Sequence, residues 1–201
     1  MNYAESKRGR AGRRPGKSGT RTAIQEEARR LFAERGYDRT TLRAISEAAG
    51  VDAALVTHFF GSKQQLFLNV VELPFDPAEV VPAVLAGDRA EIGARFARFV
   101  VGVLESPAGR GTLVGLVRAA ASEPEAARLV RELISKRVLG PLAASLSGER
   151  PELRATLAGS QVVGLVMARY VVRVEPLASL DPEALAEAVA PTFQRYLVGT
   201  L

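Results

Sequence analysis

Three observations predict an all-α protein in which a small N-terminal domain precedes a larger helical one. Apolar residues recur at helical spacing from residue 20 onward, with essentially no strand-like alternation. Glycine and proline interrupt this pattern at positions that suit helix ends. Residues 1–63 hold 13 Lys and Arg against 7 Asp and Glu, whereas the remaining residues hold 14 against 15. Binding to a polyanion is therefore expected in the first third of the chain.

The first segment, residues 1–19, is predicted to be a disordered basic arm. It contains six Lys and Arg, four glycines and almost no apolar residues. Two interpretations stay open, a phosphate- or minor-groove-binding arm and a solubilising tail. No apolar stretch follows the charges, so a secretory signal is not expected.

Residues 20–73 are predicted to form a domain of short helices. The first has Ile24, Ala28 and Leu31 on one face and should end at Gly36. The second should begin after the N-cap Thr41 and close at Gly50. The third helix should begin after the N-cap Asp52 and pack Leu55, Val56 and Phe59 inward. The fourth should begin with a capping box from Ser62 to Gln65 and stop at Pro74. Its expected inward residues are Leu66, Phe67, Val70 and Leu73.

The stretch from Thr41 to Lys63 has the organisation of a helix-turn-helix. Two short helices are joined through Gly50, which tolerates the positive φ that the turn needs. Such a motif rests the first helix on phosphate and places the second in the major groove. The recognition-helix residues that face away from the core are predicted to read DNA, namely Ala53, Ala54, Thr57 and His58. Arg43, a cation early in its helix, favours a nearby anion.

This stretch resembles the N-terminal domain of the TetR family of regulators. The resemblance lies in TTLRAISEAAGVD at residues 40–52 and HFFGSKQQLF at residues 58–67, and it extends over about residues 20–70. It implies phosphate contacts at Thr41 and Lys63, and base or groove contacts at Arg43, Ala53, Ala54, Thr57 and His58. Many members have two consecutive aromatic residues before His-Phe. Here Thr57 precedes His58, so one of these two must replace the missing phenol contact to phosphate.

Residues 74–201 are predicted to form a helical dimerisation and effector domain. Prolines between residues 74 and 84 mark its start, and the expected helices cover residues 77–86, 88–105, 109–121, 124–146, 151–173 and 181–198. Residues 162–172 are apolar nearly all round, so they need cover on every side. We expect the same helix of a second copy to provide it, together with a stripe on the last helix, Leu185, Val189, Phe193 and Leu197. The protein is therefore predicted to be a homodimer.

The resemblance also implies that this second domain binds a small-molecule effector. The predicted lining is mainly apolar with two polar anchors, and consists of Phe96, Phe99, Leu113, Leu116, Val117, Arg118, Gln161, Val166 and Met167. A mainly apolar effector is expected. The competing interpretation is that these side chains only fill the core of the domain.

The sequence thus predicts a cytoplasmic, ligand-responsive repressor that binds double-stranded DNA. An activator or a ligand-independent DNA-binding protein are the alternatives. There is no cysteine and only one histidine, so no metal site and no cofactor are expected. No catalytic motif is found, so an enzyme is not predicted. Arg169 and Arg173 interrupt the most apolar stretch, so no membrane partner is expected. A protein that coats nucleic acid without specificity would not need the capped turn.

Overall fold

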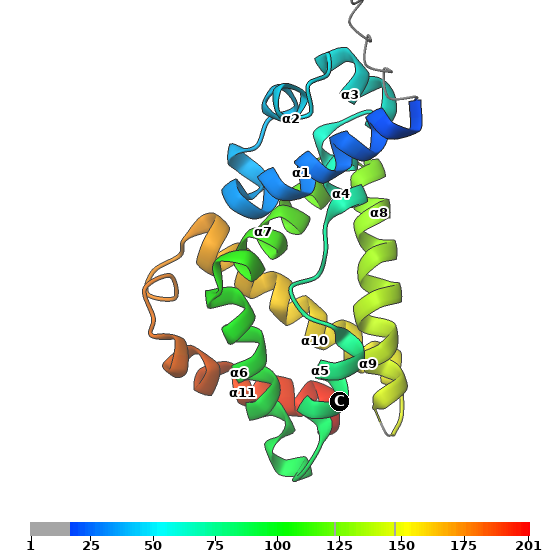
Figure 1. The fold of residues 1–201 in the computed structure, drawn as a ribbon. Helices are drawn as coiled ribbons and strands as arrows, with labels where there is room; N and C mark the ends of the chain where they lie inside the picture. Colours follow the sequence, from blue (N-terminus) through cyan, green and yellow to red (C-terminus); the bar gives the residue numbers. More distant parts are fainter. Residues whose placement is uncertain (1–16, 123, 147) are drawn as a thin grey trace, which may run out of the picture.

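The computed structural model describes residues 17–122, 124–146 and 148–201, and every regular element in these ranges is a helix. The N-terminal helices α1 to α4 form a unit that we call the head (Figure 1). Its helices are α1 (Lys17–Arg39), α2 (Leu42–Ala48), α3 (Ala53–Phe60) and α4 (Lys63–Val70). Most of the predicted basic arm lies outside the described residues, but residues 17–19 belong to α1.

The remaining helices form the body, and α11 lies at the end opposite the head (Figure 1). They are α5 (Pro77–Leu85), the short η1 (Arg89–Glu91), α6 (Ile92–Glu105), α7 (Pro107–Ser122), α8 (Pro124–Ile134), η2 (Ser135–Leu139), α9 (Gly140–Ser145), α10 (Pro151–Leu165), η3 (Val166–Val172) and α11 (Pro182–Val198). The wider turns η2 and η3 continue α8 and α10 without a break. The predicted all-α fold is confirmed.

Side-chain caps define the short helices of the head as the sequence predicted. Thr41 accepts the N–H of Ala44 at 3.0 Å, Asp52 accepts that of Ala54 at 2.7 Å, and Ser62 accepts that of Gln65 at 3.2 Å. Each bond satisfies an amide that the first helical turn leaves without a partner. Gly36 interrupts α1 at φ 75°, so the last residues of α1 turn away from its main axis.

The head does not have a core of its own. Ile24, Leu31 and Leu66 are fully buried, and the same cluster includes Leu116 and Ala119 of α7. Gly115, directly before Leu116, faces the head at close range. A Cβ there would lie 2.8 Å from Cζ of Phe67 and 3.1 Å from Cβ of Tyr37. Helix α7 is thus the base on which α1 and α4 pack.

Two packing predictions for the head are wrong. Leu55, expected inward, is 39% exposed, and Phe60 is buried in its place together with Val56. The reason is helical spacing, since Val56 and Phe60 are four residues apart and share one face of α3. Leu73 lies beyond the end of α4, which stops at Val70, four residues before Pro74.

The apolar stripe of α11 faces the interior of its own chain. Leu185, Phe193 and Leu197 are buried against α6, and the Phe96 and Phe193 rings meet edge to face with centroids 4.9 Å apart. Gly93 permits this approach, because a Cβ there would lie 2.5 Å from the carbonyl oxygen of Ala190. The expectation that this stripe covers a second copy is therefore wrong, and the stripe belongs to the core of the body.

The helical stretch from Pro151 to Val172 keeps an apolar face exposed. Val163 is 50% exposed and Met167 is 37% exposed, and Leu153 lies on the same helix. By length and composition alone this stretch, of mean hydropathy 1.4, could cross a membrane, a test that the core helices of soluble proteins also pass. Its other face packs on α9 and α11, and Arg169 within it is buried in an ion pair with Glu105.

Candidate nucleic-acid interface and inter-domain cleft

Helices α2 and α3 pack on each other at the tip of the head, as a helix-turn-helix requires (Figure 1). Gly50 adopts φ 65° in the turn between them, and the N–H of Val51 donates to the carbonyl of Ser46 at 3.0 Å. Val56 and Phe60 anchor α3 to the core. The orientation of α3 is therefore fixed by packing before any DNA is bound.

The outer face of α3 carries the predicted base-reading residues. Ala53, Ala54, Thr57 and His58 are all exposed, and Leu55 joins them. The Thr57 hydroxyl is held only by a 3.4 Å bond to the carbonyl of Ala53, so it can turn to a base edge or a phosphate. The small Ala53 and Ala54 allow close approach of the helix to the groove.

Thr41 and Arg43 lie exposed at the start of α2. The Thr41 oxygen caps the helix, and its hydroxyl hydrogen remains available to a phosphate oxygen. Arg43 Nε binds Glu47 Oε1 at 2.9 Å along the helix. Glu47 thus provides the nearby anion that was expected for Arg43. A contact with DNA would replace the Glu47 carboxylate by a phosphate as the partner of Arg43.

Lys63, the other predicted phosphate contact, is folded back onto the end of α1. Its Nζ lies 3.4 Å from the carbonyl oxygen of Asp38 and 4.3 Å from the centre of the Tyr37 ring. Burial lowers the pKa of Lys63, partly offset by the Asp38 carboxylate. Lys63 would have to leave these partners, or extend past them, to contact phosphate.

Sequence reasoning missed Arg21, a basic residue beside the recognition helix. Its guanidinium carbon lies 5.5 Å from the centre of the Phe60 ring, so an aromatic face positions this cation near the end of α3. Arg21 and Phe60 are far apart in the sequence, and only their packing reveals the relationship.

The predicted effector residues are mostly separated in the structure. Phe96 contacts Phe193, Phe99 contacts Phe75, Leu116 is in the core below the head, and Val166 is buried. Leu113, Val117 and Gln161 are partly buried, and Met167 is exposed. Of the predicted residues, only Arg118 lines the cavity at the junction of head and body. It is paired with Asp38.

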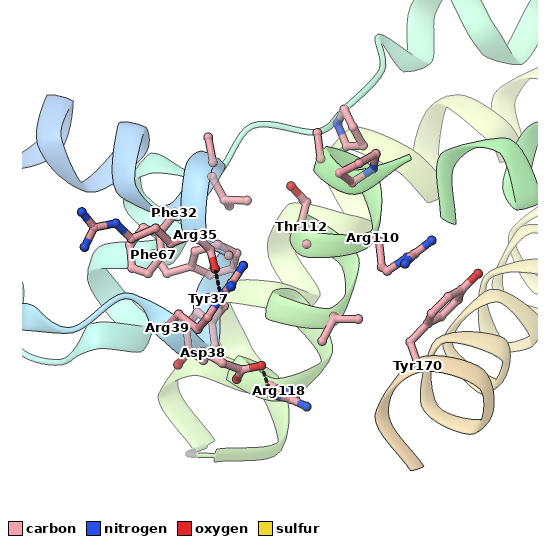
Figure 2. Close-up of a pocket in the computed structure, with 18 of the residues that line it drawn as sticks. Phe32, Arg35, Tyr37, Asp38, Arg39, Phe67, Arg110, Thr112, Arg118 and Tyr170 are labelled. Carbon is pink, nitrogen blue, oxygen red and sulfur yellow. Dashed lines mark hydrogen bonds and ion pairs between the residues drawn. The ribbon is translucent and has the colours of Figure 1, made fainter. Parts of the chain in front are cut away.

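That cavity, of about 1060 Å³, lies between the head and the body (Figure 2). We call it the inter-domain cleft. One wall is formed by the end of α1 and residues 70–74, and the opposite wall by α7, the end of η3 and part of residues 173–178. Figure 2 shows Tyr37 and Asp38 on the first wall and Arg110 and Tyr170 on the second. A molecule in the cleft would therefore touch both domains.

A charged cluster supports the body wall of the cleft. Glu105 Oε1 accepts the Tyr170 hydroxyl at 2.7 Å and Arg169 Nη2 at 2.9 Å, while Oε2 accepts Arg110 Nη2 at 2.9 Å. Burial opposes ionisation of Glu105, but the hydrogen bonds from Tyr170 and Arg169 outweigh it and lower the pKa of this carboxyl. The carboxylate thus holds two guanidinium groups and one phenol in fixed positions.

Comparison with known proteins identifies both halves of the chain. Residues 24–70 match the family described as bacterial regulatory proteins, tetR family. Residues 90–197, more than half of the chain, match the tetracyclin repressor-like C-terminal domain. The chain belongs to the TetR family. This family consists of DNA-binding transcription regulators and not of enzymes. The predicted class of protein is therefore confirmed.

Individual relatives of this TetR-family chain support the same assignment. It is 36% identical over 97 residues to the transcriptional repressor AcnR of Corynebacterium glutamicum, covering 48% of this chain and 46% of that protein. It is 56% identical over 43 residues to the regulatory protein RaaS of Mycobacterium tuberculosis, covering 21% and 20%. The chain thus spans less than half the length of these curated relatives.

A solved TetR-family structure matches nearly the whole chain. The regulator SCO0857 from Streptomyces coelicolor is 39% identical, with a TM-score of 0.55 over 93% of this chain and 99% of that one. The multidrug-binding protein EbrR has a TM-score of 0.63 at 18% identity, covering 88% and 99%, which shows a shared fold.

Proposed function

We propose that this TetR-family protein is a transcriptional repressor that binds a palindromic operator as a homodimer and releases it when a small effector binds. The observation that carries the proposal is the exposed face of α3, where small and polar side chains surround Thr57 while Val56 and Phe60 fix the helix in the head. A helix held rigidly by its core and exposing such residues suits the major groove. We propose that the protein acts in the cytoplasm, where the DNA is.

The DNA-contacting set that we propose is the one that the sequence predicted, extended by two residues. Thr41, Arg43 and Lys63 would contact phosphate or the groove edge, and Ala53, Ala54, Thr57 and His58 would read bases. Leu55 and Arg21 are added because the first is exposed on α3 and the second is held near its end by Phe60. Phosphate contacts fix the register, and base contacts specify the sequence.

The exposed apolar face of α10 and η3 supports the homodimer. Val163 and Met167 are four residues apart on this face, with Gly164 exposed beside them. The same face of a second copy would cover these side chains through a two-fold axis, which would present two heads to the two halves of a palindrome. This uses the helix that the sequence singled out, although not the α11 stripe.

A small-molecule effector is supported by the family and by the inter-domain cleft. EbrR was solved with proflavin, and a structural neighbour from Bacillus subtilis, the regulator FadR, was solved with stearoyl-CoA. In this chain a cavity of about 1060 Å³ lies where the head meets the body. A ligand whose affinity differs between two head positions would shift the equilibrium between them.

Fluorescence anisotropy with the DNA directly upstream of the gene tests this function. The titration uses about 150 mM salt and a scrambled duplex of the same composition, because non-specific affinity falls steeply with salt. We expect tight binding to the upstream DNA alone, saturating at two chains per site. Equal and weak binding to both duplexes, together with no enriched sequence in a genome-wide selection of bound DNA, would refute a specific operator reader.

A further inference from the structure

The lining of the inter-domain cleft has an excess of positive charge. Its lining includes seven arginines and five acidic residues. Most of the acids are already engaged: Asp38 by Arg118, Glu72 by Arg29, Glu105 by Arg110 and Arg169, and Glu175 by the Ser179 hydroxyl. Arg35 and Arg173 line the cleft without an acidic partner among the described residues.

The arginines of the body wall are held in place before any ligand arrives. Arg169 is only 7% exposed, and it donates to Glu105 and to the carbonyl of Leu177. Arg110 lies over the Tyr170 ring with its guanidinium carbon 5.0 Å from the ring centre. Two arginines share the single Glu105 carboxylate, so this cluster keeps one net positive charge beside the cavity. A preorganised cation loses less entropy on binding an anion than a mobile one.

Both walls of the cleft also supply apolar side chains. Phe32, Val71, Leu73 and Pro74 lie on the head wall beside its charged residues, and Ala108 and Val114 of α7 lie on the body wall. Between the two walls, Gly111 of α7 leaves room, because a Cβ at this position would meet nothing within 4 Å. The cleft therefore combines a fixed cationic cluster on the body wall with apolar side chains from both walls.

We propose that the inter-domain cleft is the effector site and that its ligand is an amphipathic organic anion. The acidic group, a carboxylate or a phosphate, lies against Arg110 and Arg173, and the apolar part lies against the surface around Phe32 and Val71. This rests on the proposed ligand-responsive function and deepens it. It also replaces the expected mainly apolar effector by a charged one, since the apolar residues predicted for the site are mostly packed elsewhere.

The proposal is tested with four probes that share one ten-carbon tail, used below their micelle-forming concentrations. Decanoate and decyl phosphate carry the acidic groups, whereas decanol is neutral and decylammonium is cationic. Calorimetric titration of the full chain is expected to show at least tenfold tighter binding of one or both anions than of decanol, and no binding of decylammonium. The stronger anion identifies which acidic group the cleft takes.

Two variants locate the binding site. Gly111→Phe should project a ring into the cavity without a clash at its Cβ, and replacing a helical glycine favours folding, so we expect a folded protein in which anion binding is lost. Arg173→Gln should weaken anion binding about fivefold to tenfold and leave decanol unchanged. Arg98→Gln, an exposed arginine of α6 outside the cleft, is the matched control and should bind like the parent.

Operator binding, followed by anisotropy with each probe, separates this proposal from the proposed function. Release of DNA by an anion in the parent but not in Gly111→Phe supports both the ligand-responsive function and the proposed effector site. Anion binding that Gly111→Phe abolishes, with no effect on DNA, upholds the site and refutes the effector response. Release that persists in Gly111→Phe upholds the response and refutes the site. Equal affinity for decanol and the anions, or no binding of any probe, also overturns the proposal.

Discussion

Arg118 of α7 forms an ion pair with Asp38 at the end of α1, and this pair connects the body to the head (Figure 2). The same Asp38 accepts Lys63 Nζ through its backbone carbonyl. One residue of the head therefore contacts both the body and a lysine that we propose to bind phosphate. A shift of α7 relative to α1 would act directly on the start of α4.

The Arg118–Asp38 pair should contribute little to stability but should be measurable. Both side chains are more than a third exposed, so a double-mutant cycle of Arg118→Gln and Asp38→Asn should give a coupling of about 0.5 kcal/mol in urea unfolding. The same variants should weaken effector-induced release of DNA more than DNA binding itself. A coupling energy of zero, with unchanged effector-induced release of DNA, would show that the pair contributes neither to stability nor to the response to the effector.

Thr57 should contribute to the choice of sequence. Thr57→Val keeps the methyl group and removes the hydroxyl, and we expect about threefold to tenfold weaker binding to the selected operator, with unchanged binding to a scrambled duplex. Thr57→Ser, which keeps the hydroxyl, is the matched control in the same anisotropy titration. Equal losses on both duplexes would remove Thr57 from base reading.

Lys63 should contribute to affinity without contributing to sequence choice. Lys63→Ala should weaken binding to all duplexes alike and reduce the slope of log affinity against log salt by about one. Lys63→Arg keeps the charge and should preserve the slope. If the slope of Lys63→Ala equals that of the parent, the lysine serves only to bind Asp38 and Tyr37 within the head.

The exposed face of α10 and η3 should govern assembly. Val163→Glu would place two like charges near a two-fold axis, and we expect the dimer to dissociate at least tenfold more readily. Sedimentation equilibrium measures the change, and Ala144→Glu, at an exposed position of α9, is the control. A Val163→Glu protein that stays dimeric at parent concentrations would place the interface elsewhere.

Glu105 should make part of the stability dependent on pH. Its pKa is lowered in the folded state, so its contribution is complete above the unfolded value of about 4.3 and is lost as the pH falls through the folded value. Glu105→Gln should cost about 1–3 kcal/mol at pH 7 through the weakened bonds to Arg169 and Tyr170. Between pH 6 and pH 3 it should lose less stability than the parent.

Urea unfolding across this pH range measures both effects. Glu187→Gln, at an exposed site on α11, controls for the general loss of a negative charge. A Glu105→Gln protein whose stability falls with acid as steeply as that of the parent would show that other carboxylates dominate the acid response.

Local signals predicted the head well. The caps at Thr41, Asp52 and Ser62 depend on residues two or three positions away, so the sequence contains the whole interaction. The prediction for Leu55 was wrong because α3, a helix of two turns, carries four large apolar residues, and only the packing decides which of them face inward. Phe60 was passed over for the same reason.

Long-range relationships in the body could not be predicted in this way. The α11 stripe looked like a dimer face, but apolar spacing does not state which chain covers it, and α6 of the same chain does. The sequence does not reveal the cleft, because its walls join residues near 37, 72, 110 and 170 and because many of its lining residues are charged rather than apolar. Glu105 and Arg169 are 64 positions apart.

The glycine at position 115 limits how this regulator can be recombined with its relatives. The head of one family member could be fused to the body of another, in order to combine a new DNA specificity with an existing ligand response. In this chain the Phe67 ring and the Tyr37 Cβ lie directly against the backbone of α7 at Gly115, with no space for even one methyl group. A grafted head would seat correctly only if its side chains at positions 37 and 67 matched that bare surface. Compatibility is therefore decided at the junction of head and body, where Tyr37 and Phe67 also line the inter-domain cleft.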